Sequence, residues 1–396
     1  VNEGFGATIG SIGIIIIAGV VIGTFLERSG GAYALAQRLL RLIGPKRLHG
    51  AMAFIGYVVS IPVFADSGFI IMSSLNKALT KQAGLSLAGT AIALSVGLTA
   101  THTMVPPTPG PIAAAGILEA DLGTVILIGL ITSSLALLVT VIFVKRLGRR
   151  FYIDPAPELD DAAVAERLRE APSPVLAFLP IVVPIILIVL RSFADYPTQP
   201  LGTGWLATWC IHLGNPVVAL LIGMLLAFLL PRRWDRQLLS TSGWVGEALT
   251  SAAIIILITG AGGAFGKVLQ TSDLGALLED HVAGLGLGLW LPFLVAAAMK
   301  TAQGSSTVAL ITTASIVAPL LPGLGLEDAT GRALVVIAIG AGSAVVSHAN
   351  DSFFWVVTQL SHMDVRQGYR LQSVGTGLLG FIAIIVLSLL QWLFFH

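Results

Sequence analysis

Long stretches without a single charged side chain dominate this chain and restrict what it can fold into. Of its 396 residues, 11% are charged and 55% are hydrophobic, whereas a soluble domain carries about a quarter of its residues as charged side chains. Crossing the apolar core of a bilayer takes about 20 residues of helix. Five uncharged stretches are long enough: 5–26, 82–118, 122–144, 196–231 and 371–396. The sequence therefore predicts an all-α polytopic membrane protein, with the lipid bilayer as its surroundings.

The composition also excludes several classes of protein. Cys210 is the single cysteine, so no disulfide framework can form within the chain. A balance of 22 basic against 21 acidic residues leaves a net charge of +1, which argues against a nucleic-acid partner. Residues 261–268 (AGGAFGKV) lack the first glycine and the final hydroxyl of a phosphate-binding loop. We expect no enzymatic activity, no cofactor and no metal.

The positions of the polar residues predict how the chain crosses the membrane. Two apolar segments, 51–76 and 284–319, have a polar interruption near the middle and are interpreted as re-entrant hairpins that enter and leave on one face. With this assignment, 18 of the 22 Lys and Arg residues fall on one face, which the positive-inside rule makes cytoplasmic. The predicted crossings are 5–26, 85–118, 122–144, 174–190, 216–230, 243–265, 332–360 and 373–395.

The same order of elements occurs twice, in opposite orientations. A helix, a connector, a hairpin, a broken helix and a further helix follow one another in 5–144 and again in 243–395, as in the inverted repeats of secondary transporters. We divide the chain into a first repeat (1–144), a cytoplasmic linker (145–173) and a second repeat (174–396). Helices 174–190 and 216–230 have no counterpart in the first repeat, so the symmetry predicts two transmembrane helices upstream of Val1.

Two predicted crossings cannot be continuous helices. Residues 106–111 (PPTPGP) hold four prolines, each of which removes a backbone donor and clashes with the preceding turn. Residues 340–351 (GAGSAVVSHAND) are rich in glycine and small polar residues inside an otherwise apolar span. Irregular backbone at membrane depth is tolerated where it is buried in protein or lines a wet cavity, and the resulting half-helix ends suit an anionic ligand.

A few ionisable residues fall within these apolar spans, where they are expensive and mark candidate functional sites. Asp66 lies at the first hairpin tip and Asp351 at the second break, while His102 and His348 each lie in a break beside a hydroxyl residue. Residues 300–307 (KTAQGSST) combine one cation with hydroxyls, an amide and a glycine, which suits a polyhydroxy carboxylate. A simpler interpretation is also open, in which each carboxylate caps a helix half or pairs with Lys300.

Several stretches resemble the gluconate:proton symporter (gluconate permease) family of the ion-transporter superfamily. They are GTFLERSGGA (23–32), SIPVFADSGF (60–69), GLTATHTMVPPTPGP (97–111), KTAQGSSTVALITTASIVAP (300–319) and GAGSAVVSHANDSFFW (340–355). The resemblance implies uptake of gluconate or a related sugar acid with protons, by an elevator-like alternating access, in the bacterial inner membrane. Lys300 departs from the arginine expected there, and a lysine loses bidentate carboxylate binding.

From the residues and this resemblance we assign two groups of site residues. Asp66, His102 and Asp351 are expected to carry the coupling proton. The expected substrate-binding residues are Ser67, Thr103, Lys300, Gln303, Ser305, Ser306, Thr307, His348, Asn350 and Asp351. The sequence does not choose among gluconate, other aldonates, uronates and small hydroxy or amino acids, and a homodimer is possible.

Three alternatives to proton symport remain open at this point. A sodium-coupled carboxylate symporter would use hairpin carbonyls and hydroxyls in place of a proton carrier. A channel would need no alternating access. A membrane metalloenzyme would hold zinc or iron on Asp66, His102, His348 and Asp351.

Overall fold

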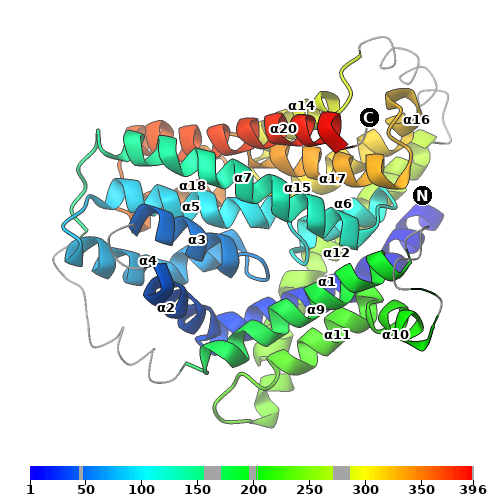
Figure 1. The fold of residues 1–396 in the computed structure, drawn as a ribbon, viewed down its shortest axis with the longest axis horizontal. Helices are drawn as coiled ribbons and strands as arrows, with labels where there is room; N and C mark the ends of the chain where they lie inside the picture. The colour runs from blue at the N-terminus through cyan, green and yellow to red at the C-terminus, as the bar shows by residue number, and fades with distance from the viewer. Residues whose placement is uncertain (44–47, 156–170, 196–201, 203, 271–285, 395–396) are drawn as a thin grey trace.

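The structure, a computed structural model, describes the chain except residues 44–47, 156–170, 196–201, 203, 271–285 and 395–396. The described residues form helices and no strands, as the uncharged stretches predict (Figure 1). The longer helices are α1 (Asn2–Arg28), α2 (Gly31–Ile43), α3 (Leu48–Val59), α4 (Ala65–Gln82), α5 (Leu87–Met104), α6 (Pro109–Ile117), α7 (Leu122–Gly148), α9 (Pro174–Ala194), α10 (Trp205–Leu213), α11 (Pro216–Ala227), α12 (Trp244–Gln270), α14 (Trp290–Gln303), α15 (Ser306–Val317), α17 (Ala329–Ala344), α18 (Ser352–Leu360) and α20 (Val374–Phe394). Short helices are η2 (Arg236–Leu239), η3 (Ala318–Leu320), α16 (Leu321–Leu324), α19 (Val365–Gly368) and the π-helical turn η4 (Tyr369–Ser373).

Seven helical segments of the described chain are long and apolar enough to cross a membrane, and the pair α10–α11 makes an eighth if it counts as one span. Six of the seven coincide with predicted crossings. The seventh, Ser306–Leu324, lies in the segment interpreted as the second hairpin. The predicted crossing 332–360 does not appear among them, because α17 is only 16 residues long before its helix breaks.

The helices form two groups that lie against each other (Figure 1). In one group α1 packs along α12, and α9 packs against α10 and α11. In the other, α5 is surrounded by α3, α7 and α17, while α20 packs on α7 and α17. Every residue of α5 is buried, because neighbouring helices cover it on all sides. The second group contains α5 at its centre and positions the cavity described below.

Both segments predicted to be hairpins are pairs of helices joined by a short turn. In the first, α3 and α4 are joined by residues 60–64. In the second, α14 and α15 are joined at Gly304 and Ser305. Gly304 has φ +85°, and a Cβ there would collide with the carbonyl oxygen of Asn350, so this tip needs glycine. Whether the pairs enter and leave on one membrane face stays a prediction.

Both predicted helix breaks are present. The first separates α5 from α6 at residues 105–108, and the second separates α17 from α18 at residues 345–351. The prediction placed the start of the second break too early, since α17 continues to Ala344. Gly340 and Gly342 serve close packing there: a Cβ at either position would collide with a backbone carbonyl, of Thr103 in α5 or of Phe293 in α14.

The region around 205–227 differs from the prediction. The helix expected at 216–230 is present as α11, but the preceding helix α10 was not predicted and meets α11 at an angle of 70°. Asn215 caps α11 by accepting the backbone N–H of Val217 at 3.0 Å, and Pro216 stands at the first helical position, where its missing donor costs nothing. Both residues favour a helix start at 216, the position at which the predicted crossing begins.

Candidate functional site

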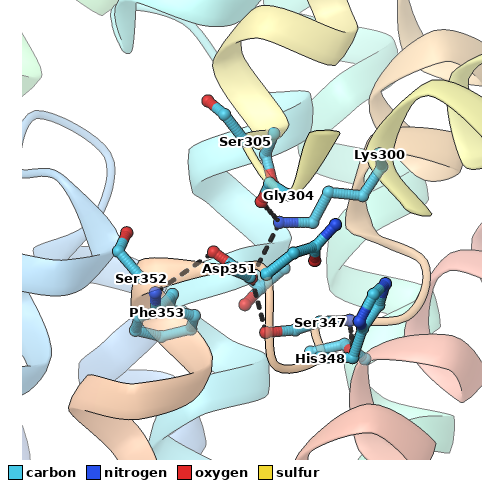
Figure 2. Close-up of polar contacts among 12 residues, drawn as sticks. Lys300, Gly304, Ser305, Ser347, His348, Asp351, Ser352 and Phe353 are labelled. Atoms are coloured by element: carbon cyan, nitrogen blue, oxygen red, sulfur yellow. Dashed lines mark hydrogen bonds and ion pairs between the residues drawn. The ribbon is translucent and has the colours of Figure 1, made fainter. Parts of the chain in front are cut away.

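The two hairpin tips and the second helix break meet around one cavity of about 260 Å³. The first hairpin contributes Phe64, Ala65 and Asp66, and α5 contributes Thr99 and His102. The second hairpin contributes Lys300 and the whole tip 303–307, and the second break contributes Ser347 and residues 350–353. Segments far apart in the sequence thus line one site, and Figure 2 shows its centre.

Three helices point their N-termini at this cavity. The first turns of α4, α15 and α18 supply Asp66, Ser306 and Ser352 to its lining. Each N-terminus carries unpaired backbone N–H groups and about half a positive charge. The N-caps of α15 and α18 are side chains that line the cavity, whereas α4 has no side-chain cap. Three such ends around one space favour a negatively charged group.

A buried ion pair lies at the centre of the site (Figure 2). The Lys300 ammonium donates to Asp351 Oδ2 at 2.7 Å, and the two side chains are 3% and 6% exposed. Lys300 also donates to the carbonyl of Gly304 at the hairpin tip. Asp351 accepts from the Ser347 hydroxyl at 2.5 Å and from the Phe353 backbone N–H at 3.1 Å. Asp351 therefore both caps α18 and pairs with Lys300, the two structural roles left open for it above.

The other two residues expected to carry protons come from α4 and α5. Asp66 accepts a hydrogen bond from the Ser352 hydroxyl at 3.1 Å, which connects the first turns of α4 and α18. His102 is 9% exposed and packs against the Phe64 ring, with 5.9 Å between ring centroids. Within the described part of the chain, His102 Nδ1 has no hydrogen-bond partner. A buried ring nitrogen without a partner is rare in proteins and is a candidate for ligand or proton binding.

Most of the expected substrate-binding residues line the cavity. They are Lys300, Gln303, Ser305, Ser306, Thr307, Asn350 and Asp351. Besides Lys300 and Asp351, two of them donate to backbone carbonyls. The Ser306 hydroxyl donates to the Ser343 carbonyl at 2.9 Å, and the Asn350 amide donates to the Thr301 carbonyl at 2.8 Å.

Three expected residues do not line the cavity. The Ser67 side chain lies beside the carboxylate of Glu27 in α1. The Thr103 hydroxyl donates to the Thr99 carbonyl within α5 at 3.0 Å, and His348 Nε2 lies 3.0 Å from the Thr301 carbonyl. The four candidate metal ligands therefore do not come together, and no cluster of three or more metal-binding side chains occurs among the described residues.

Sequence reasoning missed four polar residues of the cavity. Ser347 and Ser352 directly flank the residues chosen at the second break, so their hydroxyls could have been included. Thr99 lies one helical turn before His102 and faces the same way, a signal that helix periodicity provides. Thr376 comes from the start of α20, where its hydroxyl accepts the Ser347 backbone N–H at 3.0 Å. No local pattern in the sequence marks it.

Comparison with known proteins places this architecture in a family. The family model "GntP family permease" matches residues 1–393. The chain is 34% identical to a gluconate permease of Pseudomonas aeruginosa, over 98% of this chain and 86% of the relative. The chain is 35% identical to the inner membrane permease YgbN of Escherichia coli K12, over 97% of this chain and 86% of the relative. It is 32% identical to the Gnt-II system L-idonate transporter of the same organism, over 97% of this chain and 88% of the relative.

A solved structure shows a similar fold. The MtrF efflux pump of Neisseria gonorrhoeae superposes with a TM-score of 0.69 at 16% identity, over 98% of this chain and 82% of the MtrF chain. At that identity the likeness concerns the fold alone. The fold is thus that of an all-helical, multi-span membrane protein with a broken helix pair.

The family match confirms the resemblance drawn from the five sequence stretches. Its members are permeases, so the prediction of a transport protein rather than an enzyme is also confirmed. The match extends over the helices that form both hairpins and both breaks. The chain belongs to the GntP family and is a multi-pass permease of the inner membrane.

Proposed function

We propose that this permease is a secondary active transporter that takes up gluconate or a related sugar acid together with protons, by alternating access. The observation that carries the proposal is the convergence of three helix N-termini, a buried cation and several hydroxyls on one cavity. The names of the gluconate and L-idonate transporters among its relatives support the substrate class. The cavity volume of about 260 Å³ suits a small ligand, just below the ~300–1,000 Å³ of most ligand pockets.

The two ends of a sugar acid differ in what they need. The carboxylate needs positive potential, which the first turn of α15 and the Lys300 ammonium supply at the second hairpin tip. The hydroxyls need both donors and acceptors, and Gln303, Asn350 and Ser347 offer both around the same space. We therefore expect the carboxylate to bind at the first turn of α15 and the polyol chain to extend from Gln303 toward the second break.

The charges of the cavity explain why an anion would bind together with a proton. Lys300 is paired with Asp351, so an ionised Asp66 would give the side chains of the cavity a net negative charge, which offsets the attraction of the helix N-termini for a carboxylate. A proton on Asp66 removes that negative charge, and a proton on Asp351 releases Lys300 for the substrate. Each ligand then raises the affinity of the other by the same factor. His102 lies in the same wall and provides a third titratable group.

The proposal includes a membrane arrangement. Residues 1–144 and 174–396 form inverted repeats joined by a cytoplasmic linker, and α3–α4 and α14–α15 are re-entrant hairpins that move with the substrate in an elevator-like step. The grouping of 18 basic residues on one predicted face supports this orientation. The packing of α1, α9, α11 and α12 as a separate group supports a static part against which the cavity moves.

Uptake by purified protein in proteoliposomes tests the proposal. Wild-type protein is expected to accumulate labelled gluconate when the outside is acidic, without sodium, and to exchange labelled for unlabelled substrate in counterflow. Asp66→Asn and His102→Ala are expected to reduce proton-driven accumulation at least tenfold. Matched controls are Asp235→Asn and His212→Ala, which lie outside the cavity at exposed positions.

Three outcomes would contradict the proposal. Full proton-driven accumulation by both cavity variants removes the coupling assignment. A strict need for a sodium gradient indicates the sodium-coupled alternative. Uptake without counterflow indicates a channel.

A further inference from the structure

A second cavity of about 590 Å³ lies where α7 ends and where α3 and α5 begin. It is separate from the transport cavity, which lies at the other end of α5 beside His102. Its floor is backbone, because Gly89 of α5 and Gly148 of α7 allow the two helices to touch. A Cβ at Gly89 would lie 2.5 Å from His49 Nε2, so the His49 ring stands directly over this contact.

The polar wall of this cavity is basic. Lys145 and Arg149 lie one turn apart at the end of α7, and His49 lies in the first turn of α3. Among the described residues, no carboxylate lines the cavity. The N-terminus of α5 adds its partial positive charge beside Gly89. Burial and the charges of Lys145 and Arg149 lower the pKa of His49, so His49 supplies a neutral ring N–H rather than a charge. Two cations and a helix N-terminus around one space attract an anion.

The part of the wall nearer the middle of α7 is apolar and opens onto the outer surface of this helix. Ile142 lines the cavity and is 56% exposed, and Leu138, one turn away, is 66% exposed. Leu138, Ile142, Lys145 and Arg149 follow one another at helical spacing along one face of α7. An apolar stripe that faces lipid thus runs into the basic end of the helix.

We propose that this cavity binds an anionic phospholipid, whose phosphate headgroup contacts Lys145, Arg149 and His49 and whose acyl chain lies along Ile142 and Leu138. A free phosphate would use the basic wall alone and would leave the apolar wall exposed. The basic wall belongs to the predicted cytoplasmic face, where membranes concentrate their anionic lipids, and basic pockets between helices at that level bind such headgroups. The lipid would hold the ends of α5 and α7 together at the membrane surface.

Lipid binding to the purified full chain tests this site. Wild-type protein in neutral detergent is expected to show a rise of several degrees in the midpoint of thermal unfolding when phosphatidylglycerol is added, and no rise with phosphatidylcholine. Lys145→Ala/Arg149→Ala is expected to weaken the apparent phosphatidylglycerol affinity about 30-fold, at about fivefold per basic residue near the surface. Both side chains are exposed, so the change should leave the fold intact, which size-exclusion chromatography checks.

The matched control is Arg146→Ala/Arg150→Ala, which removes the same charge from the same helix end at exposed positions outside the cavity. It is expected to keep wild-type phosphatidylglycerol affinity. Equal losses in the two double variants would show a general charge effect and overturn the site, as would no loss in Lys145→Ala/Arg149→Ala. If inorganic phosphate alone gives the same stabilisation through Lys145 and Arg149, the site takes a free anion and the lipid assignment is wrong.

Discussion

The buried pair of Lys300 and Asp351 allows structural and transport roles to be separated by a double-mutant cycle. Lys300→Met removes the ammonium and leaves the Asp351 carboxylate 6% exposed, and its remaining partners among the described residues are the Ser347 hydroxyl and the Phe353 N–H. Leaving one member of a buried pair uncompensated costs about 3–5 kcal/mol. Asp351→Asn strands the ammonium in the same way, with the Gly304 carbonyl as its remaining partner. Asparagine can still cap α18.

Lys300→Met/Asp351→Asn removes both charges together. Because no buried charge is left unpaired, we expect the stability loss of the double variant to be smaller than the sum of the two single-variant losses by at least about 2 kcal/mol. Thermal unfolding, followed by the fluorescence of the seven tryptophans, measures the stabilities. Gluconate uptake should be lost in all three variants, because each lacks the cation, the titratable carboxylate or both.

Two results would refute this reasoning. Single-variant losses below about 1 kcal/mol, or additive losses in the double variant, would mean that the pair is not buried and coupled as described. Wild-type uptake by the stable double variant would show that the pair is structural and that substrate and proton bind elsewhere.

Two further predictions concern the hairpin tip and the surface. Gly304→Ala places a side chain at φ +85° against the Asn350 carbonyl, so the loss of stability should exceed the ~1–3 kcal/mol of backbone strain alone, and uptake should be abolished. Gly325→Ala, at φ +66° in open space, is the control for strain without collision. Equal losses of stability in the two variants would contradict the tip geometry. Glu247→Gln removes an ion pair with Arg28 in which the Glu247 side chain is 45% and the Arg28 side chain 51% exposed. It should change stability by less than about 1 kcal/mol in the same unfolding assay. A loss above about 2 kcal/mol would show a buried role for that pair.

The sequence predicted the broken helices because their causes are local. Four prolines in residues 106–111 cannot continue α5, and Asp351 is a good N-cap for a helix that restarts after it. Glycine was less informative. The glycines around Gly340 were predicted to belong to the break, but they lie within α17 and allow close contact with α5 and α14. The lack of a side chain suits glycine both to irregular backbone and to close helix packing, so the residue type does not distinguish the two.

The site could be predicted only in part, for a similar reason. Asp66, His102, Lys300 and Asp351 stand out because ionisable residues are rare in apolar spans, and the structure brings all four to one cavity. The pairing of Lys300 with Asp351 spans 51 residues, and it depends on how α14 packs on α17, which no local pattern encodes.

The positions of Ser67 and His348 follow the same rule. Each is a neighbour in sequence of a cavity residue, yet each side chain is directed to another helix, Ser67 toward Glu27 in α1 and His348 toward Thr301 in α14. Sequence proximity placed the segment correctly but did not fix the direction of the side chain.

The central claim is that sugar-acid uptake and proton uptake occur together through the cavity at the hairpin tips. The most direct measurement uses sodium-free proteoliposomes that contain a pH-sensitive dye and start with equal pH on both sides. Adding gluconate outside is expected to acidify the interior of vesicles with wild-type protein, and to leave the interior pH unchanged with Asp66→Asn. Gluconate entry without acidification of the wild-type vesicles would contradict the account.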